Sequence, residues 1–248
     1  MVAHRGASAV EAENTLPAFE AAVRAGADAI ELDVRLSADG VVVVMHDPDV
    51  GRTTDGSGLV RDHSLAELKA LRIATADGGF AEVPTLDEAF GVLGARVAID
   101  IELKQLPGEP DHDPDGEALV EATLETIAGI GSEAAVLLSS FDPTTIARVR
   151  ALGAGFPTGL LVAPGVDVHV ATAFAEREGH PWVLPFADAV EAAGEAYVGE
   201  VHAAGMALGT WIVDDPARAA ALFAWGVDAV ATNDPAALVV AATRERRA

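Results

Sequence analysis

Short apolar runs alternate with amphipathic stretches along most of the chain. The runs are rich in valine, isoleucine and leucine and have the length of buried strands, whereas the intervening stretches carry apolar residues at helical spacing. We expect strands at 1–6, 28–34, 41–45, 97–102, 135–140, 158–163, 182–184, 207–213 and 228–232. We expect helices at about 16–26, 64–71, 84–93, 116–129, 143–152, 168–178, 189–204, 215–225 and 235–246.

This alternation predicts a TIM-type (β/α)8 barrel of the α/β class. A doubly wound open sheet is the alternative, but no glycine-rich phosphate loop follows the first strand. The expected strands exceed the eight of a barrel by one, and we place the weakest of them, 182–184, at the periphery. Only about seven residues separate Asp33 from Val41. A helical crossover needs about a dozen, so we expect a hairpin or another non-helical return there.

Residues 47–83 break the alternation. Prolines and glycines mark loops, and the helix that begins at Ser64 is short. We interpret this segment as a small insertion after the third strand. The 248 residues, half of them hydrophobic, suffice for a single barrel domain over 1–248 that includes it.

Composition narrows the possible partners and the compartment. No apolar run reaches the roughly 18 residues of a membrane span, and no signal peptide precedes the first strand. We therefore expect a cytoplasmic protein without stable membrane insertion. The absence of cysteine excludes disulfides and cysteine-ligated zinc. A net charge of −23 disfavours nucleic acid as a partner, so an anionic small-molecule substrate would need a local positive centre.

Carboxylates occur in two stretches that otherwise resemble buried strands. The strand period of two puts Glu31 and Asp33 on one face, and it aligns Asp100, Glu102 and Lys104 in the second stretch. At the C-terminal rim of a barrel, Glu31, Asp33 and Glu102 would suit a hard divalent cation such as Ca²⁺ or Mg²⁺. Internal ion pairs are the less favoured alternative, and we expect the deeper Asp100 to pair within the core.

Two histidines, His4 and His46, end expected strands beside these carboxylates. Imidazole titrates near neutral pH, so such a pair suits general acid–base catalysis. Asp47 either orients a histidine or opens the Asp-Pro turn. We interpret the remaining histidines as surface residues: His63, His112, His169, His180 and His202.

Basic and aromatic residues complete the candidate site. Arg5 and Lys104 offer the positive charge that an anionic group needs, although Arg5 can also form a salt bridge with Glu13 or Glu31. Trp211, in the 207–213 strand, is either a plug of the barrel or a wall for substrate.

These residues belong to an ordered series of motifs. The series comprises His4-Arg5-Gly6-Ala7-Ser8, Glu13-Asn14-Thr15, Glu31-x-Asp33-Val34, His46-Asp47, Arg52-Thr53-Thr54, Gly56-x-Gly58, Leu65-x-Glu67-Leu68, Pro84-Thr85-Leu86, Glu102-x-Lys104, Ser140-Phe141, Trp211-x-Val213 and Asp228-x-Val230-x-Thr232. It resembles the glycerophosphodiester phosphodiesterase family and spans almost the whole chain.

The resemblance implies hydrolysis of a glycerophosphodiester to glycerol 3-phosphate and an alcohol, in a TIM-type barrel whose insertion lies over the barrel mouth. It implies a divalent metal on Glu31, Asp33 and Glu102. It also implies that His4 and His46 act as the acid–base pair and that Arg5 and Lys104 contact phosphate. From its place in the expected strand, we add Trp211 as a candidate for substrate binding. Two alternatives remain: hydrolysis of lysophospholipids or related lipid diesters, and a non-catalytic barrel that binds phosphorylated ligands.

The chain departs from the family pattern at a few positions. The family usually has Pro-Glu-Asn-Thr where this chain has Ala12-Glu13-Asn14-Thr15. It usually has Asn after Trp-x-Val, where Asp214 stands here, and Thr-Asp near the end, where Thr232-Asn233 stands. None of these changes removes an expected metal ligand or histidine.

Overall fold

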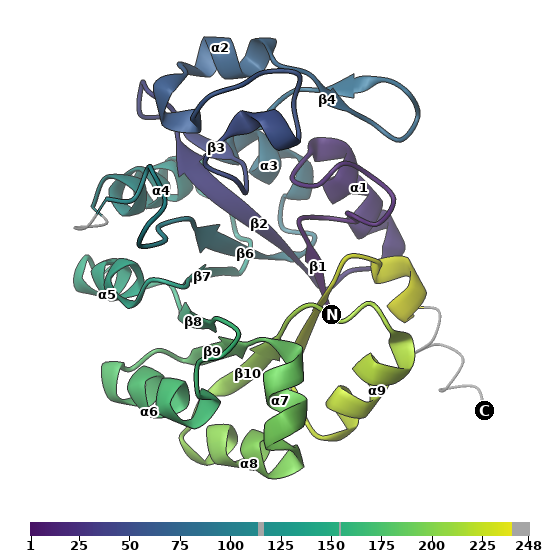
Figure 1. Ribbon diagram of the computed structural model, residues 1–248, viewed down its shortest axis with the longest axis vertical. Coiled ribbons are helices and arrows are strands. Elements are labelled where there is room, and N and C mark those ends of the chain that lie inside the picture. The colour runs from purple at the N-terminus through teal and green to yellow at the C-terminus, as the bar shows by residue number, and fades with distance from the viewer. Residues whose placement is uncertain (114–116, 154, 240–248) are drawn as a thin grey trace.

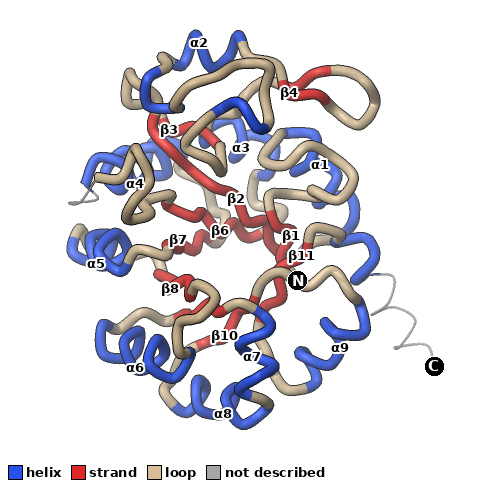
Figure 2. The backbone as a smooth tube through the Cα atoms, in the orientation of Figure 1, coloured by secondary structure: helices blue, strands red, loops and turns tan. Residues whose placement is uncertain are grey.

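Eight parallel strands close into a TIM barrel in the computed structural model, which describes residues 1–113, 117–153 and 155–239 (Figures 1 and 2). In their order around the barrel they are β1 (Val2–His4), β2 (Ala29–Leu36), β6 (Ala98–Leu103), β7 (Val136–Ser140), β8 (Thr158–Val162), β9 (Trp182–Pro185), β10 (Ala207–Thr210) and β11 (Ala229–Thr232). The first strand pairs with both β2 and β11, and this closes the sheet. The predicted fold class is therefore confirmed.

Helices surround the barrel (Figure 1). They are α1 (Leu16–Ala25), α3 (Leu86–Leu93), α4 (Glu117–Ile130), α5 (Pro143–Ala151), α6 (Val168–Glu178), α7 (Ala187–Ala193), α8 (Glu195–Ala203) and α9 (Pro216–Ala224). The single helix expected at 189–204 is two helices, because Gly194 adopts a positive φ that ends the first. Residues 235–239 are helical, and the rest of the helix expected at 235–246 lies outside the described residues.

The peripheral strand is β3 (Val42–Val44), not the segment at 182–184. β3 runs antiparallel to β2, with Val44 opposite Val34, so the short connection is the expected hairpin. Our placement of 182–184 at the periphery was wrong. The short β9 is hydrogen-bonded on both sides, to β8 and to β10, and this pairing compensates for its length.

The insertion follows β3 and has its own small core. It contains two 3₁₀ turns, η1 (Val50–Arg52) and η2 (Val60–Asp62), the helix α2 (Leu65–Ala70), and a two-stranded ribbon of β4 (Ile73–Ala74) and β5 (Phe80–Ala81). This core contains two residues from β3 and its end, Val43 and Met45, and five from the insertion: Val50, Val60, Leu68, Ile73 and Val83. Figure 1 shows the insertion beside the ring of helices, beyond β2 and α3, rather than across the barrel opening.

The main core lies between the outer face of the barrel and the helices. Outward-facing residues of the strands, such as Ile99, Leu138, Val183 and Val230, are fully buried there. Within the described ranges, no helix is long and apolar enough to cross a bilayer.

Candidate active site

Three buried carboxylates meet at the C-terminal rim of the barrel. Glu31 and Asp33 lie on β2, Glu102 lies on β6, and the register places Asp33 opposite Glu102. One oxygen from each of the three lies within 4.8 Å of the others. The side-chain period of the two parallel strands therefore produces an oxygen cluster at the place where the sequence predicts a metal site.

The ionisation of this cluster is strongly perturbed. Burial, together with repulsion from Asp33 and Glu102, raises the pKa of Glu31 well above its ordinary value. Burial also raises the pKa of Glu102 to about 7. Burial alone would raise the pKa of Asp33 as well, but attraction to Lys104, His46 and Arg5 holds it well below its ordinary value.

The three carboxylates are suitable ligands for a divalent cation. Glu31 Oε1 and Asp33 Oδ1 are buried and have no hydrogen-bond partner among the described residues. Carboxylate oxygens that are buried without a donor are costly, and they are also the ligands that Ca²⁺ and Mg²⁺ prefer. A bound cation would remove this cost.

Lys104 and Arg5 bring positive charge to the same rim. Lys104 Nζ donates to Glu102 Oε1 at 2.7 Å and lies 3.5 Å from Asp33 Oδ1. Arg5 donates to Glu13 at 2.9 Å, and its Nε lies 3.3 Å from Asp33. The salt bridge expected with Glu13 is therefore present, whereas Glu31 is contacted by the backbone N–H of Arg5.

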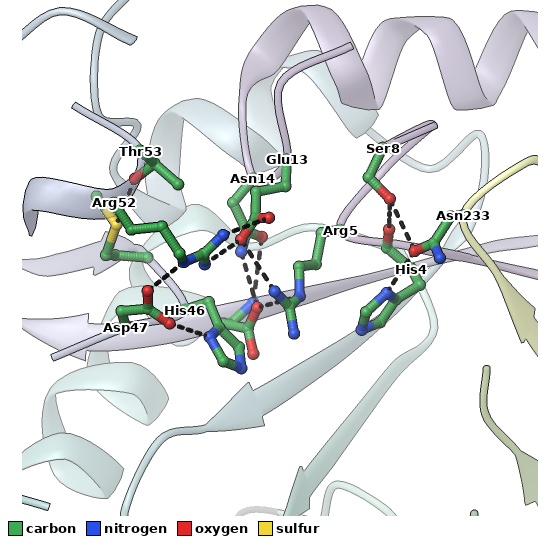
Figure 3. Close-up of polar contacts among 12 residues, drawn as sticks. His4, Arg5, Ser8, Glu13, Asn14, His46, Asp47, Arg52, Thr53 and Asn233 are labelled. Carbon is green, nitrogen blue, oxygen red and sulfur yellow. Dashed lines mark hydrogen bonds and ion pairs between the residues drawn. The ribbon is translucent and has the colours of Figure 1, made fainter. Parts of the chain in front are cut away.

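His46 is oriented by a chain of charged groups from the insertion (Figure 3). Its Nδ1 lies 2.5 Å from Oδ1 of Asp47, whose other oxygen accepts from Arg52 Nε. Arg52 also donates twice to Glu13. Burial alone would raise the pKa of Asp47, but Arg52 lowers it to about 2. The ionised Asp47 can only accept, so Nδ1 carries the proton and Nε2 remains free for proton transfer.

Arg35 fixes the main chain of His46 by donating to its carbonyl oxygen. This arginine is 1% exposed, and its Nε and Nη2 donate to the carbonyl oxygen of His46 at 2.9 and 2.7 Å. It also donates to Glu109 and Asp111 in the loop after β6. Arg35 was not among the predicted site residues, and its one signal in the sequence is a charged residue in the same apolar run as Glu31 and Asp33.

Asn14 was also missed as a residue of the site. Its side-chain amide donates to Asp33 Oδ2 at 2.7 Å and fixes the orientation of that carboxylate. Asn14 is buried and has a φ of 55°, a left-handed conformation that asparagine tolerates better than most residues. The Glu-Asn-Thr motif was visible in the sequence, but the contact was not.

His4 is held by an amide. Its Nδ1 lies 2.8 Å from Oδ1 of Asn233, which also accepts from Ser8 (Figure 3). Its Nε2 lies 3.9 Å from Glu31. Burial and the charge of Arg5 lower the pKa of His4, and burial lowers the pKa of His46. Both rings are therefore neutral near pH 7, and each has Nδ1 anchored and Nε2 free.

The two departures from the family pattern near the C-terminus form one contact. Asn233 donates to Asp214 from its side chain at 2.9 Å and from its backbone at 2.7 Å. The family pattern has Asn and Asp at these two positions, whereas this chain has Asp214 and Asn233. The carboxylate and the amide thus stand at exchanged positions, and in this chain they are hydrogen-bonded to each other.

This exchange predicts a rescue by double substitution. Asn233→Asp places a second carboxylate beside Asp214 and removes the amide donor, so we expect kcat to fall roughly threefold to tenfold, a modest loss because the pair is exposed. Adding Asp214→Asn restores the pairing and should recover most of the activity. Steady-state kinetics on the four proteins of the cycle measure the coupling, and strictly additive losses would contradict it.

Trp211 lies in the wall of a cavity of about 520 Å³ that the site residues share. Its ring packs edge-on against Phe141 and Phe186 with centroids 5.4 and 5.3 Å away, and its Nε1 donates to the carbonyl oxygen of Leu184. Trp211 is therefore a fixed wall rather than a plug. Asp100, as expected, pairs below the rim, where it accepts from Ser139 at 2.7 Å.

One of the histidines expected at the surface is buried. His180 is 1% exposed, and its Nδ1 lies 2.7 Å from Oγ1 of Thr158. Its position after α6 and next to Gly179 resembles a loop, but its ring is buried against Thr158 of β8. His169 and His202 are exposed, as expected, and His63 and His112 are partly buried.

Comparison with known proteins agrees with this geometry. The chain matches the glycerophosphoryl diester phosphodiesterase family over residues 4–237. It is 33% identical to a glycerophosphodiester phosphodiesterase of Caldanaerobacter subterraneus, and the match covers 96% of each protein. It is 32% identical to a glycerophosphodiester phosphodiesterase of Bacillus subtilis, covering 94% of this chain and 83% of that protein.

Solved structures show the same likeness. An Oleispira antarctica phosphodiesterase in complex with the product sn-glycerol-3-phosphate is 28% identical, with a TM-score of 0.86 over 98% of this chain and 96% of that one. A glycerophosphodiester phosphodiesterase from Thermotoga maritima is also 28% identical, with a TM-score of 0.78 and 96% of each chain covered. With its fold, its carboxylate cluster and its motifs, the chain belongs to the glycerophosphoryl diester phosphodiesterase family.

Proposed function

We propose that this protein hydrolyses glycerophosphodiesters to glycerol 3-phosphate and an alcohol, with residues 1–248 acting as one catalytic domain. The carrying observation is that two histidines with anchored Nδ1 atoms flank a buried carboxylate cluster at a barrel rim. Family membership over residues 4–237 supports the reaction class, a phosphoric diester hydrolase. The product bound by the Oleispira relative, sn-glycerol-3-phosphate, supports the choice of substrate.

The carboxylates of Glu31, Asp33 and Glu102 would hold the metal, for which we propose Ca²⁺ or Mg²⁺. When bound, such a cation supplies electrostatic stabilisation of the charge that develops on the phosphate oxygens. Arg5 and Lys104 add two further positive charges beside it. Phosphodiesters are anionic and resist attack, so this concentration of positive charge lowers the barrier to hydrolysis.

His46 and His4 would each carry out one of the two proton transfers of the reaction, one as the base and the other as the acid. The carboxylate of Asp47 stabilises positive charge on His46, which favours His46 as the base that deprotonates the attacking hydroxyl. The partner of His4 is the neutral amide of Asn233, which stabilises an imidazolium less, so a protonated His4 gives up its proton more readily. His4 is therefore assigned to protonate the leaving alkoxide. It acts in the form that carries a proton on Nε2, and the negative charge of the substrate phosphate favours that form. Trp211, Phe141 and Phe186 form the adjacent wall for substrate.

A panel of phosphodiesters followed by ³¹P NMR tests this assignment. We expect glycerophosphocholine and glycerophosphoethanolamine to yield glycerol 3-phosphate, whereas a long-chain lysophosphatidylcholine should be hydrolysed at a lower kcat/KM. Preferential cleavage of the lysolipid would transfer the assignment to lipid diesters. Binding of glycerol 3-phosphate without turnover of any diester would identify a non-catalytic barrel.

A further inference from the structure

The inner face of the barrel is lined by unusually small residues below the active site. Ala29 of β2 is in register with Ala98 of β6, and Gly209 of β10 is in register with Ala229 of β11. TIM barrels normally fill these inward positions with layers of bulky branched side chains. The side chain of Leu184 occupies the space beside Gly209, but the alanines at the neighbouring positions leave part of that volume unfilled.

Exposure along the strands agrees with this. In β11 the inward Ala229 and Ala231 are partly exposed, whereas the outward Val230 between them is fully buried. In β6 the inward Ala98 and Asp100 are likewise partly exposed, while their outward neighbours are buried. The space that a solvent molecule can enter therefore lies inside the barrel, not between the barrel and its helices.

This space, which we call the lumen, is continuous with the active site. One cavity of about 520 Å³ includes His4 and Trp211 at the C-terminal rim, Asp100 and Leu184 at mid-height, and Ala98 and Ala229 at the strand starts. The volume of the whole cavity, active site included, lies within the range of about 300–1,000 Å³ that is typical of small-molecule sites. The lumen therefore extends inward from the place where the phosphate would be held.

The walls of the lumen select an apolar occupant. Below Asp100, whose carboxylate already accepts from Ser139, the lining consists mainly of apolar side chains such as alanine, leucine and valine until Asp28 and Asp228 at the opposite rim. Ordered water needs two to four polar partners, which such walls do not supply. An eight-stranded barrel is also narrow, so it favours an unbranched chain over a ring.

We propose, on the basis of the phosphodiester hydrolysis proposed above, that the lumen binds an unbranched alkyl chain carried by the alcohol side of the substrate. The phosphate occupies the rim beside Arg5 and Lys104, and the chain extends inward past Leu184 toward Ala98 and Ala229. The substrate class is thereby a glycerophosphodiester of a short to medium aliphatic alcohol.

A chain-length series tests this proposal. For the wild-type protein, kcat/KM on ethyl, butyl, hexyl and octyl diesters of glycerol 3-phosphate should rise roughly two- to fourfold per buried methylene until the lumen is full. Ala98→Leu and Ala229→Leu fill the lumen from opposite walls and should flatten this series, with turnover of glycerophosphocholine within about twofold of wild type. Ala95→Leu, on the exposed side of the preceding loop, is the matched control and should leave the series unchanged.

Two results of the chain-length series would overturn the alkyl-site proposal. A flat wild-type series alongside normal hydrolysis of glycerophosphocholine overturns the proposal and indicates a lumen filled with water, with the proposed function intact. A series unchanged in both folded lumen variants also overturns it. If neither variant folds, the wild-type series decides alone.

Failure of the proposed function is distinguished by a binding measurement. If no diester is hydrolysed, calorimetric titration with octyl phosphate and ethyl phosphate replaces the kinetic series. Tighter binding of octyl phosphate by wild type, lost in Ala98→Leu, supports the alkyl site. Equal binding of the two phosphates by wild type overturns it.

Discussion

His46→Ala and His4→Ala are each expected to lower kcat by roughly 100-fold or more, the usual contribution of a positioned acid or base. Each substitution removes a ring whose Nδ1 is fixed by a neighbour and whose Nε2 is free for proton transfer. Because neither ring lies in the hydrophobic core, circular dichroism and the melting temperature should change little. Steady-state kinetics on glycerophosphocholine measure the effect.

His169→Ala provides the matched control for both substitutions. His169 lies on the exposed face of α6, where its imidazole lies 2.8 Å from Glu200 and packs against the ring of Tyr197. It should leave kcat within about twofold of wild type. Turnover close to wild type in either His4→Ala or His46→Ala would remove that histidine from the proton transfers.

Glu31→Gln should abolish activity and yet stabilise the metal-free protein. The glutamate is buried among like charges, and its pKa in the folded chain is raised above the ordinary value of 4.5. Its ionisation therefore costs folding free energy, and the neutral amide avoids this cost while it can still accept from the backbone N–H of Arg5. Each kcal/mol that is relieved raises the melting temperature by roughly 2–4 °C.

The pH dependence of this gain follows from the direction of the shift. The folded and unfolded chains both hold a protonated Glu31 below the unfolded value near 4.5, so the gain disappears there. It grows as the pH rises through the folded pKa and is complete above it. Thermal melts in chelator at pH 5 and pH 8 should show the larger advantage at pH 8.

Metal addition distinguishes the two proteins further. Ca²⁺ or Mg²⁺ should raise the melting temperature of wild type but not of Glu31→Gln, because binding to the folded state alone stabilises it. Glu125→Gln, at an exposed position of α4, is the control and should behave as wild type. A variant that is less stable than wild type in chelator at pH 8 would show that the carboxylates are not in conflict.

Most of the fold could be predicted from the sequence because barrel strands and helices alternate with regular periods. The exception concerned which strand is peripheral. Run length favoured 182–184 as the outlier, but strand membership depends on hydrogen-bonded neighbours, and β9 has one on each side. The short link after Asp33 indicated the peripheral strand correctly, because a strand that follows so short a connection cannot run parallel to β2.

The candidate site was predictable where residues follow strand geometry. Glu31, Asp33 and Glu102 come together because the period of two and the parallel register place them at one rim. The supporting residues were not predictable, because two of them reach the site from outside the barrel strands and the third, on β2, makes its contact with a backbone atom. Arg52 arrives from the insertion, Asn233 follows the last barrel strand, and Arg35 acts through a backbone carbonyl that no motif encodes.

A coupled assay for released glycerol 3-phosphate is the most direct test of metal-dependent phosphodiester hydrolysis at this rim. The purified protein would be incubated with glycerophosphocholine in EDTA, and then with Ca²⁺ or Mg²⁺ added in excess of the chelator. We predict no release above background in EDTA and full recovery with at least one of the two cations. Undiminished release in EDTA, or none with either cation, would contradict the proposed function.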